Sequence, residues 1–167
     1  MNRLLLIICI FIYSSIPAFS SLPYDYSSVK AVPIKMKITE EISTKQQIYE
    51  GKELTFKVIS NVFYKNKFIV KKNQIIKARI EMIVTSGMNG FPAEIIIDNF
   101  DIPNVRKTQL MSTYIKTGQN RSLIVYPIKL ALSWLPGVGN VVNLIKGGHA
   151  KIKTKDTVTI YYYPEWK

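Results

Sequence analysis

Residues 76–82 alternate between apolar and charged side chains, and this period of two indicates a half-buried β-strand. The apolar positions that would share one face, extended to residue 84, are Ile76, Ala78, Ile80, Met82 and Val84. A helix is excluded, because it would place Lys77, Arg79 and Glu81 inside the apolar stripe that a packed helix needs.

Similar patterns recur along the chain, separated by turn-forming residues. Strands are predicted at 34–39, 53–59, 68–70, 92–100 and 108–116, and a pair of strands at 149–153 and 157–163. Short strands at this spacing predict an all-β fold, an antiparallel barrel or sandwich of about eight strands. The predicted core comprises Ile38, Leu54, Phe56, Val58, Ile76, Ala78, Ile80, Met82, Ile95, Ile97, Ile152, Val158 and Ile160.

The N-terminus has the order of a secretory signal. Arg3 precedes ten apolar residues at 4–13, Pro17 interrupts them, and Ala18-Phe19-Ser20 places small residues before a cleavage point. A membrane span needs about 20 apolar residues, so this run is too short. We therefore expect a signal peptide at 1–20, a flexible leader at 21–33, and a single β domain at 34–167.

Cys9 lies within the predicted signal, where we interpret it as one more apolar residue of the run at 4–13. The residues before it, Leu6-Ile7-Ile8, are not the small ones expected before a lipidated cysteine. The processed chain would then contain no cysteine and one histidine. This composition excludes a disulfide framework, a Cys/His zinc site and most nucleophile–histidine catalysis.

Residues 123–145 interrupt the β pattern with an apolar stretch whose only charge is Lys129. Pro127, Pro136, Gly137 and Gly139 would break a long helix. Three interpretations remain open: a strand leading into a short helix at 128–135 that plugs or covers the β domain, an apolar excursion that contacts a membrane or partner, and a transmembrane span. The residues expected to make a membrane or partner contact are Trp134, Leu135 and Val138.

Acidic and histidine residues give no catalytic or metal pattern. Glu94 and Asp98 share a strand face, but they point away from the apolar residues and would be solvated. His149 has no second ligand near it in sequence. Gly137-Val138-Gly139 lacks the Lys-Ser/Thr pair of a phosphate loop. We therefore expect no catalytic residue, no cofactor and no metal.

The chain is basic, with a formal charge of +12. Lysines cluster in two regions, and aromatic residues lie close to both, as on many polyanion-binding surfaces. The alternative is that these lysines only keep the β domain soluble. The candidate contacts for an anionic surface are Lys71, Lys72, Lys77, Arg79, Lys146, Lys151, Lys153 and Lys155.

Parts of the sequence resemble the β-barrel modules of type IV secretion channel proteins. The similarity lies in the alternating segments 50–58 and 70–78, preceded by Ile42-Ser43-Thr44, and residues 145–153 form a second stretch with an envelope-type β pattern. Those modules carry an Ile-Pro-Lys-Gly turn, whereas this chain has Val70-Lys71-Lys72-Asn73. The resemblance implies a β-barrel in the cell envelope and transfers no functional residue.

Together these features predict an exported, non-enzymatic protein that is periplasmic or associated with the cell envelope. It would act as a binding or structural module whose partner is an envelope protein, a lipid or an anionic polymer. Export argues against a nucleic acid as the usual partner. The alternative is a secreted small β-barrel carrier of an apolar ligand, with Trp134 in its lid. The oligomeric state stays open.

Overall fold

The structure, a computed structural model, describes residues 30–134 and 141–165. The predicted signal peptide, most of the predicted leader, and the candidate contacts Leu135 and Val138 lie outside these residues. The strands are β1 (Val32–Ile38), β2 (Ile42–Ser43), β3 (Glu53–Val58), β4 (Val62–Tyr64), β5 (Lys67–Val70), β6 (Ile75–Val84), β7 (Glu94–Asp101), β8 (Leu110–Met111), β9 (Tyr114–Thr117), β10 (Lys151–Ile152) and β11 (Thr157–Tyr162). The helical elements are η2 (Lys107–Gln109), α2 (Ser122–Ala131) and η3 (Val142–Leu144).

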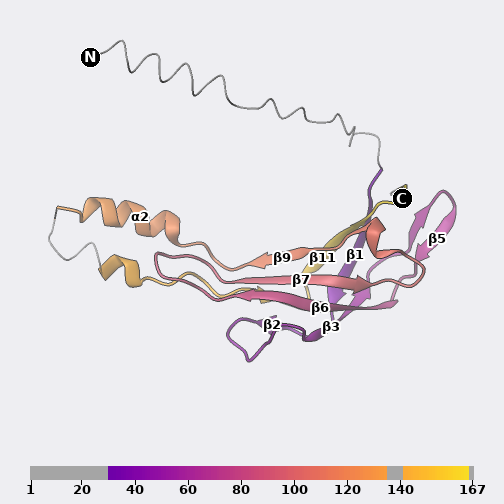
Figure 1. The fold of residues 1–167 in the computed structure, drawn as a ribbon, viewed down its shortest axis with the longest axis horizontal. Helices are drawn as coiled ribbons and strands as arrows, with labels where there is room; N and C mark the ends of the chain where they lie inside the picture. The colour runs from indigo at the N-terminus through magenta and orange to yellow at the C-terminus, as the bar shows by residue number, and fades with distance from the viewer. Residues whose placement is uncertain (1–29, 135–140, 166–167) are drawn as a thin grey trace, which may run out of the picture.

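Seven strands form one antiparallel sheet in the order β8-β11-β1-β3-β6-β7-β9 (Figure 1). Two small antiparallel pairs, β10-β2 and β4-β5, accompany it. The predicted all-β antiparallel class is confirmed.

The sheet curls into a half-barrel, because β9 at one end of the strand order contacts β11 near the other end. An ion pair crosses this seam: Lys116 Nζ in β9 lies 3.1 Å from Asp156 Oδ2, just before β11. The same Oδ2 atom accepts a hydrogen bond from the backbone N–H of Lys153. Asp156 therefore fixes the turn into β11 and links the two edges of the half-barrel.

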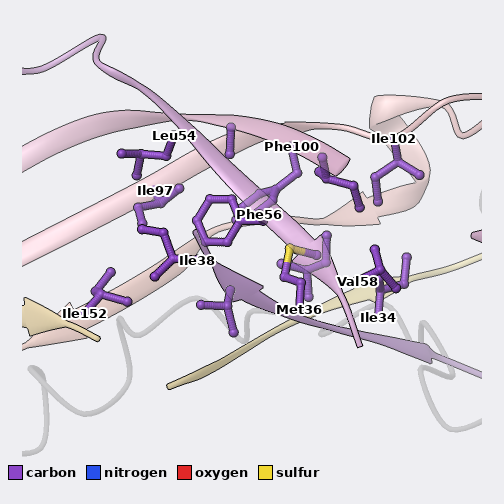
Figure 2. Packing of buried hydrophobic residues seen from close by; sticks show 14 of the residues in the cluster. Ile34, Met36, Ile38, Leu54, Phe56, Val58, Ile97, Phe100, Ile102 and Ile152 are labelled. Carbon is purple, nitrogen blue, oxygen red and sulfur yellow. The ribbon is translucent and has the colours of Figure 1, made fainter. Parts of the chain in front are cut away.

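The core fills the concave side of this sheet, and Figure 2 shows its centre. The rings of Phe56 and Phe100 pack at 5.3 Å between centroids, with Met36 fully buried in the same cluster. Every residue of the predicted core is buried except Met82.

Met82 is 49% exposed, so its assignment to the core is wrong. The register between β6 and β7 shifts between Ile80, which pairs with Ile97, and Met82, which pairs with Ile96. A bulge of this kind adds a residue to one strand and reverses the faces of the residues beyond it. Val84, predicted to lie on the same face, is exposed for the same reason.

The C-terminal strands were predicted to pair with each other, and this is also wrong. β10 pairs with β2 through Ile152 and Ile42, whereas β11 pairs with β1 and β8. The turn between β10 and β11 therefore moves the chain from a small sheet to the main sheet.

The predicted helix at 128–135 begins earlier, at Ser122. Its start is stabilised by Asn120, whose Oδ1 atom accepts hydrogen bonds from the backbone N–H and the hydroxyl of Ser122 at 2.9 and 2.5 Å. Pro127 lies inside α2, where it removes one backbone donor without ending the helix.

Candidate functional site

An apolar excursion leaves one end of the half-barrel. We use this name for residues 122–134 and 141–145, which include α2 and η3 and lie beyond the end of the main sheet in Figure 1. Its large apolar side chains are mostly exposed: Leu123, Ile124, Tyr126, Ile128, Leu130, Trp134, Val141, Leu144 and Ile145. A helix that covered the barrel would bury these residues, so the predicted covering arrangement is not observed.

The exposed side of α2 is its apolar side. At about 100° per residue, the exposed apolar positions of α2 spread over about 200° of its circumference. The remaining side holds Val125, which is buried, and Lys129. Surface helices of globular proteins normally show the opposite arrangement, with the apolar stripe facing the core.

A neck of three chain segments, 87–93, 118–121 and 143–148, joins the excursion to the barrel. Backbone hydrogen bonds connect the segments in pairs: Gly90 N–H donates to Ile145 O at 2.8 Å, and Arg121 N–H donates to Gly90 O at 3.0 Å. Gly148 N–H donates to Gln119 O at 2.8 Å. The neck therefore holds the excursion in a defined position.

Glycines allow these segments to approach closely. A Cβ atom on Gly147 would lie 2.0 Å from the carbonyl oxygen of Phe91, and one on Gly118 would lie 2.3 Å from that of Gly148. Gly90 has a φ of +76°, and a Cβ atom on it would lie 2.5 Å from the carbonyl carbon of Arg121. Any residue larger than glycine at these positions would therefore force the segments apart.

An open pocket of about 900 Å³ lies beside the neck. Five of its lining residues are basic or imidazole-bearing, and none of the described lining residues is acidic. We call it the basic pocket; its lining is Ser43, Lys45, Gln46, Gln119, Arg121, Leu144, Lys146, Gly147, Gly148, His149 and Lys151.

The cations of the basic pocket differ in their pairing. Lys151 Nζ lies 2.7 Å from Glu41 Oε2, and its hydrogen bond is the main cause that lowers the pKa of Glu41, so this pair stays ionised at neutral pH. Within the described part of the chain, Lys45, Arg121 and Lys146 form no ion pair. No carboxylate of residues 30–134 and 141–165 therefore compensates their charge at ion-pair distance.

The basic residues selected from the sequence do not form one surface. Lys146 and Lys151 line the basic pocket. Lys71 and Lys72 lie in the turn after β5, at the opposite end of the molecule (Figure 1). The other four lie on the outer face of β6 and around the β10–β11 turn: Lys77, which pairs with Glu53 at 2.7 Å, Arg79, Lys153 and Lys155.

Three members of the basic pocket were not predicted from the sequence. Lys45 and Arg121 were not among the candidate contacts for an anionic surface, and His149 was considered only as a metal ligand. Lys45 follows β2 and His149 precedes β10, so the pairing of these two strands brings them together. Thr44 Oγ1 lies 3.4 Å from His149 Nδ1 across this pair. No local sequence signal connects residues about a hundred positions apart.

Trp134, the described member of the predicted membrane or partner contact, is 75% exposed in the turn that follows α2. It lies on the apolar excursion, as the contact hypothesis requires. Its accessibility makes it a usable fluorescent reporter.

The carboxylates weighed for catalysis lie in β7 on the barrel wall. Asp98 accepts hydrogen bonds from the hydroxyls of Ser112 and Thr113 at 2.5 and 3.0 Å and from the N–H of Asn99 at 2.6 Å. Burial raises the pKa of Asp98, but these hydrogen bonds outweigh that effect, and the pKa lies below its ordinary value. Asp98 thus connects β7 to the segment between β8 and β9.

Because the pKa of Asp98 is lower in the folded state, its stabilising effect is present above about pH 4 and is lost as the pH falls through the folded value. We expect Asp98→Asn to lower the free energy of unfolding by about 1 kcal/mol at pH 7, since the carboxylate is partly screened by solvent. The difference between parent and variant should shrink towards pH 3. Urea unfolding at both pH values measures it, and a constant difference would contradict this assignment.

No protein-family model matches the chain, and no curated protein matches it significantly. Within residues 30–134 and 141–165, no helix has the length and apolar character needed to cross a bilayer. Among the same residues, no three His, Cys, Asp or Glu side chains gather as a metal site would require.

Proposed function

We propose that this chain is an exported, non-enzymatic module of the cell envelope that attaches to a membrane surface through its apolar excursion. The observation that carries the proposal is the exposure of nine large apolar side chains on the apolar excursion, which the backbone hydrogen bonds of the neck hold in place. Contiguous exposed apolar surface of this kind marks an interaction site.

Burial of this surface would release enough free energy for attachment. A fully buried side chain of this size contributes about 1.5–3 kcal/mol, so four of the nine would contribute roughly 6–12 kcal/mol, offsetting an association cost of several kcal/mol. The neck limits the conformational entropy that binding would cost.

A membrane surface fits the composition of the excursion better than an apolar protein surface does. Trp134 and Tyr126 combine an aromatic body with a polar atom, as residues at the membrane interface do. Lys129 could extend from the helix to the lipid headgroups. The signal-like residues 1–20 would bring the chain to such a membrane.

The carrier alternative would need an internal cavity. The centre of the half-barrel is instead occupied by Met36, Phe56 and Phe100, which are at most 1% exposed. This packing favours the attachment module. Mass spectrometry of an organic extract of the purified protein tests the alternative, which predicts a stoichiometric apolar molecule.

Vesicle binding tests the proposed function. With Trp166→Phe as the background, Trp134 is the only tryptophan in the chain. Its emission should shift to the blue when phosphatidylcholine vesicles are added. Leu130→Asp in the same background should weaken binding about 30-fold or more, because about 2 kcal/mol of burial is lost.

Leu130 is 76% exposed, so Leu130→Asp should leave the melting temperature unchanged. Phe68→Asp provides the matched control, since Phe68 is an exposed apolar residue in β5 at the opposite end of the molecule (Figure 1). Binding that is absent in the parent, or reduced equally by the two substitutions, would contradict the proposal.

A further inference from the structure

We propose that the basic pocket binds the phosphate group of an anionic phospholipid, with Arg121 and Lys146 as its principal ligands. The inference rests on the proposed membrane attachment and adds the chemistry of the lipid that the module recognises.

The position of the basic pocket is the first support. Arg121 directly precedes α2, Leu144 ends η3, and Lys146 follows it, so the pocket opens where the apolar excursion joins the barrel. The polar headgroup layer of a bilayer is about 5–8 Å thick on each side of the hydrocarbon. Once the apolar side chains enter the hydrocarbon, groups at the base of the excursion lie at the level of the lipid phosphates.

The charge of the basic pocket is the second support. Lys45, Arg121 and Lys146 have no ion-pair partner among the described residues, and the described lining contains no carboxylate that would repel a phosphate. A guanidinium can bind two phosphate oxygens at once, and lysine ammonium groups add further donors. An anion would therefore compensate a charge that the described residues leave without an ion-pair partner.

The construction of the site is the third support. Arg121 and Lys146 come from two of the three segments of the neck, and Gly147 and Gly148 form part of the lining. Lys45 is held beside them by the pairing of β2 with β10. The cations thus come from separate parts of the chain and line one pocket, unlike lysines spread along a solvated strand. Its volume of about 900 Å³ can accommodate a glycerophosphate headgroup.

Co-sedimentation with two kinds of vesicle tests this inference. One contains phosphatidylcholine alone, and the other contains phosphatidylglycerol in addition. The parent should bind the anionic vesicles about 100-fold more tightly than the neutral ones. Each cation near an anionic surface contributes about five-fold in affinity, so Arg121→Gln/Lys146→Gln should reduce this preference by about 25-fold. Its binding to phosphatidylcholine alone should change by less than about two-fold, because the choline group of that lipid already compensates the charge of its phosphate.

Lys71→Gln/Lys72→Gln is the matched control, because it removes the same charge from exposed residues. These lysines precede β6, whereas the neck follows it, and ten residues of strand extend about 33 Å. That distance exceeds the screening length of about 10 Å at 0.1 M salt, so the control should bind like the parent. Thermal melting monitored by circular dichroism should show all variants equally folded.

The outcomes separate the inference from the proposed function. Equal binding to both kinds of vesicle overturns the headgroup site and leaves membrane attachment intact. No binding to either kind overturns attachment and, with it, the lipid site. Equal losses in the two double variants also overturn the site, because they indicate a diffuse charge effect.

A soluble probe distinguishes the two sources of phosphate. Isothermal titration with glycerol 1-phosphate should give binding far weaker than that of anionic vesicles, because the probe lacks the apolar contribution. Tight binding of this probe that is lost in Arg121→Gln/Lys146→Gln, with vesicle binding unaffected, would assign the basic pocket to a soluble phosphorylated molecule and overturn the lipid assignment.

Discussion

Ile80→Asp is expected to leave the chain unfolded. Ile80 is 1% exposed in the middle of β6. The substitution removes about 1.5–3 kcal/mol of burial and places a carboxylate among apolar side chains, at a further cost of several kcal/mol. The sum is comparable to the whole stability of a domain this size, about 5–15 kcal/mol. Circular dichroism and urea unfolding provide the measurement.

Met82→Asp is the matched control for Ile80→Asp. The two residues lie two positions apart on one strand and were expected on one face, but the bulge turns Met82 outward. We expect Met82→Asp to change the free energy of unfolding by about 1 kcal/mol or less. If both variants unfold, Met82 faces the core and the bulge is misplaced. If neither does, β6 does not form the centre of the sheet.

The second large effect is expected at the neck, from Gly147→Ala. The new methyl group would meet the carbonyl oxygen of Phe91 at 2.0 Å and its carbon at 2.2 Å. Backbone atoms cannot rotate away as a side chain can, so segments 87–93 and 143–148 must separate. We expect a loss of about 3 kcal/mol, at the upper end of the range for overpacking. Thermal unfolding measures the loss, and exchange of the Gly147 amide proton reports the opening.

Gly87→Ala tests whether this effect comes from the close approach. Gly87 lies in the same neck and accepts a hydrogen bond from Gly147 N–H at 3.2 Å. Its added methyl group would lie 3.5 Å from Phe91 Cβ, an ordinary contact, so we expect less than about 1 kcal/mol of change. Similar stabilities for Gly87→Ala and Gly147→Ala would contradict the close packing of the neck.

The strands of the barrel could be predicted from the sequence because their signal is local. Burial on one face of a sheet imposes a period of two, and residues such as Leu54, Phe56 and Val58 display it without reference to the rest of the chain. The failure at Met82 has a defined cause: a bulge changes the face by one residue, and its position depends on the partner strand β7.

The apolar stretch at 123–145 could likewise be predicted only in part. Its composition established that it differs from the β domain, but apolar residues can be buried by the protein or presented to a partner with equal sequence patterns. The neck decided between these arrangements, because backbone hydrogen bonds among three distant segments direct α2 away from the barrel.

The sequence by itself determined the all-β class, most of the core and the unusual apolar stretch, since each depends on neighbours within a few residues. Tertiary structure alone decided the bulge at Met82, the outward direction of α2 and the assembly of the basic pocket. Lys45, Arg121 and Lys146 come from three separate parts of the chain, and only strand pairing and the neck bring them together. Contacts between distant segments depend on the free energy of the whole fold, which no local pattern encodes.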